Sequence, residues 1–211
     1  MQRILTTVAL GGVLALGAGC ISYEVNLSLE KDGSGTVVVD TWVDYLGEEE
    51  GDQEVAEAPE ISEEMGPAFA ELEGVTVEEN WARTEGEGDD RREHTHLLLA
   101  FEDVEILSGQ GIFENQDLTF EKKGKEYVFT HEIRNVREQP AAETAEESSE
   151  ENEELARALF EGYTFTYTVV MPGDVTDTNG IVADDGRTVT WEWPLYDFAQ
   201  QEEIVMTATS R

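Results

Sequence analysis

The sequence predicts an α+β fold that is mainly antiparallel β-sheet with two short helices. Several segments carry an apolar residue at every second position, which is the period of a half-buried strand. Short turns rich in glycine and aspartate join neighbouring segments, as they do in hairpins. Two other segments show apolar residues at helical spacing. A β-sandwich with the helices as decorations is the alternative architecture.

A hairpin is expected to open the folded part of the chain. From Tyr23 to Leu29 every second residue is apolar, and polar residues stand between them. Residues 31–35 read Lys-Asp-Gly-Ser-Gly, a composition that is typical of a turn. Residues 36–43 then return as a strand rich in β-branched residues.

The first helix is expected after an acidic stretch at residues 47–60, which we interpret as a solvated loop. The apolar residues at helical spacing are Ile61, Met65, Phe69 and Leu72. Proline is tolerated in the first turn of a helix but not in its interior. Pro67 therefore predicts a helix that begins near Gly66 and ends at Gly74.

Four more strands are expected in the middle of the chain, at residues 75–81, 91–101, 118–120 and 127–133. The second of them has one apolar face, formed by Leu97, Leu99 and Phe101. A helical turn is expected at residues 104–107. The last two strands should form a hairpin through the lysine-rich turn at residues 122–125.

A second acidic loop at residues 138–152 precedes the second predicted helix, which should stop at Gly162. Its apolar stripe comprises Leu155, Leu159 and Phe160. Three strands then close the chain, at residues 163–169, 189–193 and 204–208. Val189, Trp191 and Trp193 alternate with polar residues, so they should share one face, and we expect Trp191 to lie in the core.

The first nineteen residues predict an export signal that is not part of the fold. Arg3 is followed by a mostly apolar run at residues 4–16, too short to span a bilayer, and then by small residues. We therefore expect a signal peptide at residues 1–19 and one domain at residues 20–211. Cys20 is the only cysteine in the chain, so no internal disulfide is possible.

Residues 17–20, Gly-Ala-Gly-Cys, resemble the lipobox of bacterial lipoproteins. Leu16 stands four residues before the cysteine, where that motif usually has leucine three before. The resemblance implies cleavage before Cys20 and attachment to a membrane through acyl chains on Cys20. Two or three chains anchor stably, because each buried CH₂ contributes about 0.8 kcal/mol. An ordinary secretion signal followed by a chance cysteine is the alternative.

The chain is strongly acidic, with 48 acidic against 13 basic residues and a formal net charge of -35. This balance excludes nucleic acid as a partner, because binding it requires Lys and Arg to neutralise phosphates. An anionic membrane surface would repel the domain as well, so the lipid must supply the anchoring. A saline habitat and acidic linkers are both open as the origin of the charge.

Residues 163–193 resemble the LppM-like domain of bacterial lipoproteins. The shared features are a strand that ends in Pro-Gly, a valine, an Asn-Gly turn and a hairpin that leads into a tryptophan strand. The matching positions are Met171, Pro172, Gly173, Val175, Asn179, Gly180, Gly186 and Trp191. The resemblance implies a protein of the bacterial cell envelope with a possible lipid or glycolipid ligand.

Two functions remain open at this point. The first is a non-catalytic, lipid-anchored binding domain for a lipid, glycan or envelope protein, without metal or cofactor. The second is a metal-dependent hydrolase. His94 and His96 have the i, i+2 spacing that can bring two imidazoles to one metal, and His131 is a candidate third ligand. A solvated strand face beside Arg92 and Glu93 would explain the same pattern without a metal.

Overall fold

The computed structural model describes residues 19–45, 61–86, 92–135, 157, 160 and 162–211. Nearly all of the predicted signal peptide lies outside these residues. So do both acidic stretches, at 47–60 and 138–152, and most of the predicted helix before Gly162.

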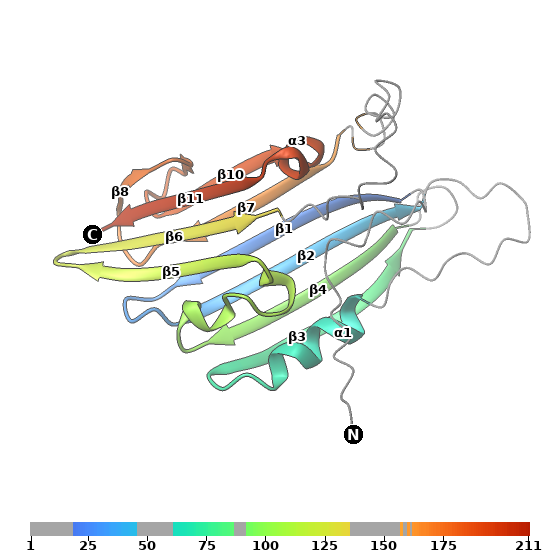
Figure 1. The fold of residues 1–211 in the computed structure, drawn as a ribbon, viewed down its shortest axis with the longest axis horizontal. Helices are drawn as coiled ribbons and strands as arrows, with labels where there is room; N and C mark the ends of the chain where they lie inside the picture. The colour runs from blue at the N-terminus through green and yellow to red at the C-terminus, as the bar shows by residue number, and fades with distance from the viewer. Residues whose placement is uncertain (1–18, 46–60, 87–91, 136–156, 158–159, 161) are drawn as a thin grey trace, which may run out of the picture.

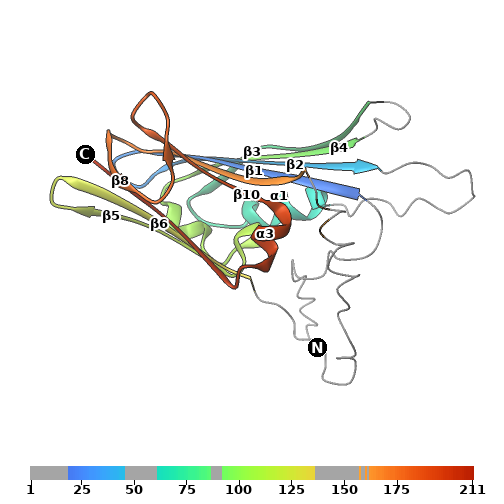
Figure 2. The ribbon, with the colours of Figure 1, turned by 90° about the horizontal axis from the view of Figure 1, so that it is seen from above.

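Two β-sheets face each other across one hydrophobic core (Figures 1 and 2). Sheet A has seven strands, in the order β3 (Val75–Glu85), β4 (Arg92–Phe101), β2 (Gly35–Tyr45), β1 (Gly19–Leu29), β7 (Thr164–Val170), β10 (Thr188–Pro194) and β9 (Ile181–Val182). Sheet B has four, in the order β5 (Gln116–Lys123), β6 (Glu126–Arg134), β11 (Glu203–Ser210) and β8 (Val175–Thr178).

Helices α1 (Ile61–Ala70) and α3 (Leu195–Gln200) lie on the side of sheet A that also faces sheet B (Figure 2). We call this side the inner face of sheet A and the opposite side its outer face. Two 3₁₀ turns, η3 (Val104–Leu107) and η4 (Gly111–Phe113), lie between β4 and β5. None of the described helices is long and apolar enough to cross a membrane. The predicted class, mainly antiparallel sheet with two short helices, is confirmed, although α3 itself was not predicted.

Alternation along the strands decides which side chains enter the core. In β4 the side chains of Leu97, Leu99 and Phe101 are buried, whereas those between them are only partly covered. The predicted hairpins form, since β1 pairs with β2 and β5 with β6 in antiparallel register. Sheet A also contains a parallel pair, β1 with β7. Turn signals reveal only neighbours in sequence, so this pairing could not be predicted from them.

The prediction that α1 begins near Gly66 is wrong. The helix begins at Ile61 and contains Pro67. A proline at this position removes the bond from its nitrogen to the carbonyl of residue 63. That loss is offset by packing, because Phe69 is fully buried and its ring meets Phe113 edge-on at 6.2 Å.

A β-bulge in β3 reverses the faces of that strand. Val77 pairs with Leu99 and Glu79 pairs with Leu98, so Glu78 is the extra residue. Unbroken alternation would place Trp81 on the same inner face as Val77. After the bulge, Trp81 instead pairs with His96 and lies on the outer face.

The Asn179-Gly180 turn joins β8 in sheet B to β9 in sheet A. The Asn179 carboxamide oxygen accepts hydrogen bonds from Trp191 Nε1 at 2.8 Å and from the Thr207 amide at 2.9 Å. A Cβ at Gly180 would lie 2.6 Å from Trp191, so only glycine fits there. This turn therefore ties the two sheets together at one edge of the core.

Candidate functional site

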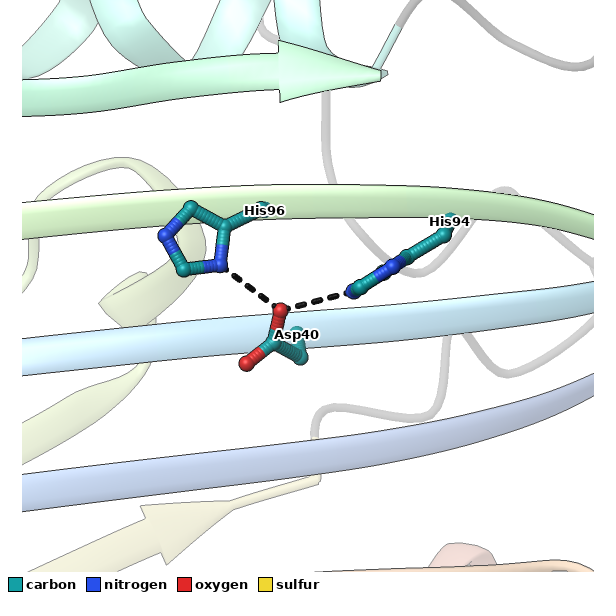
Figure 3. A group of neighbouring side chains, drawn as sticks. All are labelled: Asp40, His94 and His96. Carbon is teal, nitrogen blue, oxygen red and sulfur yellow. Dashed lines mark hydrogen bonds and ion pairs between the residues drawn. The ribbon is translucent and has the colours of Figure 1, made fainter. Parts of the chain in front are cut away.

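Strand pairing brings Asp40 of β2 together with His94 and His96 of β4 on the outer face of sheet A (Figure 3). Asp40 pairs with His96, and Trp42 of β2 pairs with His94. On the other side of β4, Trp81 pairs with His96. The two histidines share a face because they are two residues apart on one strand. The residues Asp40, His94 and His96 are called the His–Asp cluster below.

One carboxylate oxygen connects the cluster. Asp40 Oδ1 accepts hydrogen bonds from Nε2 of His94 and from Nδ1 of His96, both at 2.8 Å. The three side chains are 15, 12 and 16 % exposed, so they are shielded but reachable from solvent. Charge-assisted contacts of this length are strong when partly withdrawn from water.

The second nitrogen of each imidazole also faces a carboxylate. His94 Nδ1 lies 3.5 Å from Glu85, and His96 Nε2 lies 3.7 Å from Glu79. Desolvation raises the pKa of the Glu85 carboxyl, but the facing groups of His94, Arg92 and Arg83 lower it by more, so the pKa lies below its usual value. Each imidazole is therefore held between two acidic groups.

Two indole rings support the imidazoles. Trp42 stacks on His94 with ring centroids 4.6 Å apart, and Trp81 stacks on His96 at 4.8 Å. The Arg83 guanidinium covers Trp81 at 4.4 Å from the ring centroid. Stacking limits the rotation of both histidines. The result is a polar cluster flanked by two indole rings on the outer face of sheet A.

Two imidazoles and a carboxylate can hold a shared proton or a metal ion. Among the described residues, the cluster is a group whose potential ligand atoms all lie within 4.8 Å of one another. His₂-carboxylate sets bind divalent transition metals in proteins.

His131 does not join this cluster, so the alternative in which it is a third metal ligand beside His94 and His96 is wrong. It belongs to β6 of sheet B, and its side chain is fully buried between Phe113, Phe129 and Tyr167. His94 and His96 instead point away from the core. Burial lowers the pKa of His131 to about 3, so the ring is neutral in the core.

The structure places Cys20 as the second residue of β1, paired with Asp44 of β2. Asp44 in turn pairs with Arg92 of β4. Cys20 is thus four residues along the sheet from the level of Asp40, a separation of about 13 Å. The expected acylation point and the His–Asp cluster lie toward the same end of sheet A.

Sequence reasoning missed Asp40, Trp42 and Trp81 as neighbours of the two histidines. One signal was available for Asp40. Aspartate is depleted in strands, so an aspartate in the middle of a β-branched strand indicates a polar neighbour. No local signal pairs residue 40 with residue 96. That contact requires β4 to lie beside β2, and these two strands are far apart in the sequence.

Comparison with known proteins gives one family. Residues 48–211 match the family model described as the LppM domain. The NMR structure of the folded domain of LppM from Mycobacterium tuberculosis is similar to this chain, with a TM-score of 0.44 and 14 % sequence identity over 94 % of each chain. No curated protein matches the chain.

Proposed function

This chain belongs to the LppM domain family, and from that premise we propose that it is a non-catalytic, lipid-anchored protein of the bacterial cell envelope. Its folded domain binds a lipid, a glycan or another envelope protein. The position of Cys20 directly at the start of β1 is the observation that carries the proposal.

An acyl group on Cys20 would hold the domain close to the membrane. The cysteine is already part of the β1–β2 ladder, because Cys20 pairs with Asp44. No spacer therefore separates the proposed anchor from the sheet. The end of sheet A that contains the start of β1 and the end of β2 would lie nearest to the lipid headgroups.

The charge of the chain makes the acyl chains necessary. A formal net charge of -35 opposes adsorption to an anionic lipid surface. Buried CH₂ groups contribute about 0.8 kcal/mol each, so two or three acyl chains outweigh this repulsion. The membrane affinity of the protein would then depend almost wholly on one residue.

The residues that resemble the family pattern have structural roles, which supports a function without catalysis. Asn179 and Gly180 hold Trp191 and β11 in place. A Cβ at Gly173 would clash with the backbone of Arg211. These residues specify the fold and contribute no reactive group. Large side chains fill the space between the sheets, among them Phe129, Tyr167 and Met206, so a partner would bind on an outer surface.

Replacing Cys20 by serine tests the anchor. We expect the Cys20→Ser variant to fold normally and to move from the membrane fraction to the soluble fraction of the producing bacterium, because a hydroxyl cannot take the thioether-linked lipid. Ultracentrifugation with immunoblotting would measure the distribution, and labelled fatty acid would report acylation. Ser22→Ala, two residues further along β1, is the matched control and should stay in the membrane. Quantitative retention of Cys20→Ser in the membrane pellet would exclude the proposed anchor.

A further inference from the structure

We propose that Asp40, His94 and His96 form a binding site for a divalent transition-metal ion, with Zn²⁺ the ion whose chemistry suits the donors best. The ligand atoms are Oδ1 of Asp40, Nε2 of His94 and Nδ1 of His96. All three come from the adjacent strands β2 and β4, so the site does not depend on the lipid anchor.

The ligand atoms are close to the spacing that a metal requires. Both imidazole nitrogens lie 2.8 Å from Asp40 Oδ1. A tetrahedral ion with bonds of about 2.0–2.1 Å needs ligand atoms about 3.3 Å apart. Each nitrogen–oxygen separation must therefore open by about 0.5 Å. A metal would take the place of the two protons that now point at Asp40.

Carboxylates already face the ring nitrogens of both histidines that would not bind the metal. A metal-bound histidine usually donates its other ring N–H to a carboxylate, which fixes the tautomer and the orientation of the ring. In the cluster, Glu85 faces Nδ1 of His94 and Glu79 faces Nε2 of His96. Among the described residues, His94 Nδ1 is buried and has no hydrogen-bond partner. With a metal on Nε2 in place of its proton, Nδ1 would carry the ring hydrogen and could donate it across the 3.5 Å distance to Glu85.

Further contacts hold Glu85 and the two imidazoles in position. Arg83 and Arg92 form ion pairs with Glu85 at 2.7 and 3.2 Å. These contacts hold the Glu85 carboxylate in position without a metal ion. The stacked rings of Trp42 and Trp81 restrict the imidazoles. The charge of the cluster also favours a cation, since the carboxylates of Asp40, Glu79 and Glu85 all lie against the two imidazoles.

The donor set indicates which metals would bind. Imidazole nitrogen suits Zn²⁺, Cu²⁺ and Ni²⁺, whereas Ca²⁺ and Mg²⁺ require more oxygen ligands than the cluster supplies. Three protein ligands at a partly exposed site leave at least one coordination position for water or an external ligand. The acidic surface of the protein would raise the local concentration of cations around the site.

A titration of the purified full-length chain in detergent with Zn²⁺ tests the site. Calorimetry in an excess of Mg²⁺, which occupies unspecific carboxylates, should give one Zn²⁺ per chain. Nitrogen-15 NMR of the imidazole rings should show shifts for His94 and His96. His131 is an internal control, because it is buried on the other sheet and its signal should not move. Saturating Zn²⁺ that moves neither His94 nor His96 would overturn the proposal.

Four variants separate this site from unspecific binding. Asp40→Asn and His96→Gln should each weaken the affinity for Zn²⁺ more than tenfold, because each removes a ligand. Glu85→Gln should weaken it by roughly tenfold, the lower end of the usual effect of changing the carboxylate that holds a metal-bound histidine. Asp177→Asn, at an exposed carboxylate on β8, should leave the affinity unchanged. Affinity that stays within twofold in both ligand variants would refute the site, whether or not Zn²⁺ binds elsewhere.

Discussion

Between pH 7 and pH 4, the free energy of unfolding of the wild-type protein should fall by about 3 kcal/mol more than that of the His131→Leu variant. The pKa of His131 is 6.5 in an unfolded chain and is lowered by burial to about 3 in the fold. Between these values the unfolded state binds a proton that the folded state does not. Stability from this residue is therefore fully present above about pH 6.5 and declines as the pH falls toward 3.

The contacts of His131 explain why it remains neutral. The side-chain amide of Gln116 donates to the carbonyl of Ile112 at 2.8 Å, so its oxygen faces His131. That oxygen lies 2.7 Å from Nε2 of His131, which therefore carries the proton and donates it. Within the described part of the chain, Nδ1 is buried without a hydrogen-bond partner. A second proton would place a charge in an apolar core.

Urea unfolding of both proteins at several pH values would measure the difference. Acid also reduces the repulsion among the many carboxylates, but this effect is common to both proteins and cancels in the comparison. Leucine is close to histidine in size and suits the neighbouring rings of Phe129 and Tyr167. Parallel pH profiles for the two proteins would show that His131 does not cause the acid sensitivity.

Trp191→Ala should lower the free energy of unfolding by about 3–5 kcal/mol, the usual cost of emptying a large aromatic site. The Trp191 side chain is only 5 % exposed, and its ring meets Tyr167 edge-on at 6.3 Å. The substitution would also leave Asn179 Oδ1 without the indole N–H that it now accepts at 2.8 Å. Denaturant melts would give the change directly.

Trp193→Ala is the matched control on the same strand. Trp193 is half-buried and packs at the margin of the core against Phe165 and Phe198. Its removal should cost clearly less than that of Trp191. Iodide should accordingly quench Trp193 more readily than Trp191. A Trp191→Ala protein as stable as wild type, with Trp191 freely quenched, would contradict the assignment of this residue to the core.

Local patterns were sufficient for most of the strands. Period-two alternation correctly placed Leu97, Leu99 and Phe101 on the inner face of β4, and turn residues correctly predicted the β1–β2 and β5–β6 hairpins. They work because strand faces and tight turns depend on residues only a few positions apart. Pro67 misled the helix prediction, since the packing of Phe69 outweighs one lost backbone bond.

The candidate site could be predicted only in part. The i, i+2 spacing correctly put His94 and His96 side by side. It could not show that His131 faces the core of the other sheet, because a histidine on an alternating strand fits either face equally well. The face on which Trp81 lies could not be predicted from alternation. The single extra residue Glu78 moves Trp81 from one face of the sheet to the other.

By itself, the sequence determined the class of fold, the hairpins between neighbouring strands and the one cysteine that could carry a lipid. Only the tertiary structure decided that β4 lies beside β2 and that β7 runs parallel to β1. Asp40 and His96 meet across 56 residues of chain for that reason. The physical cause is that several strands here show the same period-two pattern, so many pairings would bury the apolar faces equally well. The packing of the whole core selects one of them, and with it the neighbours of the histidines.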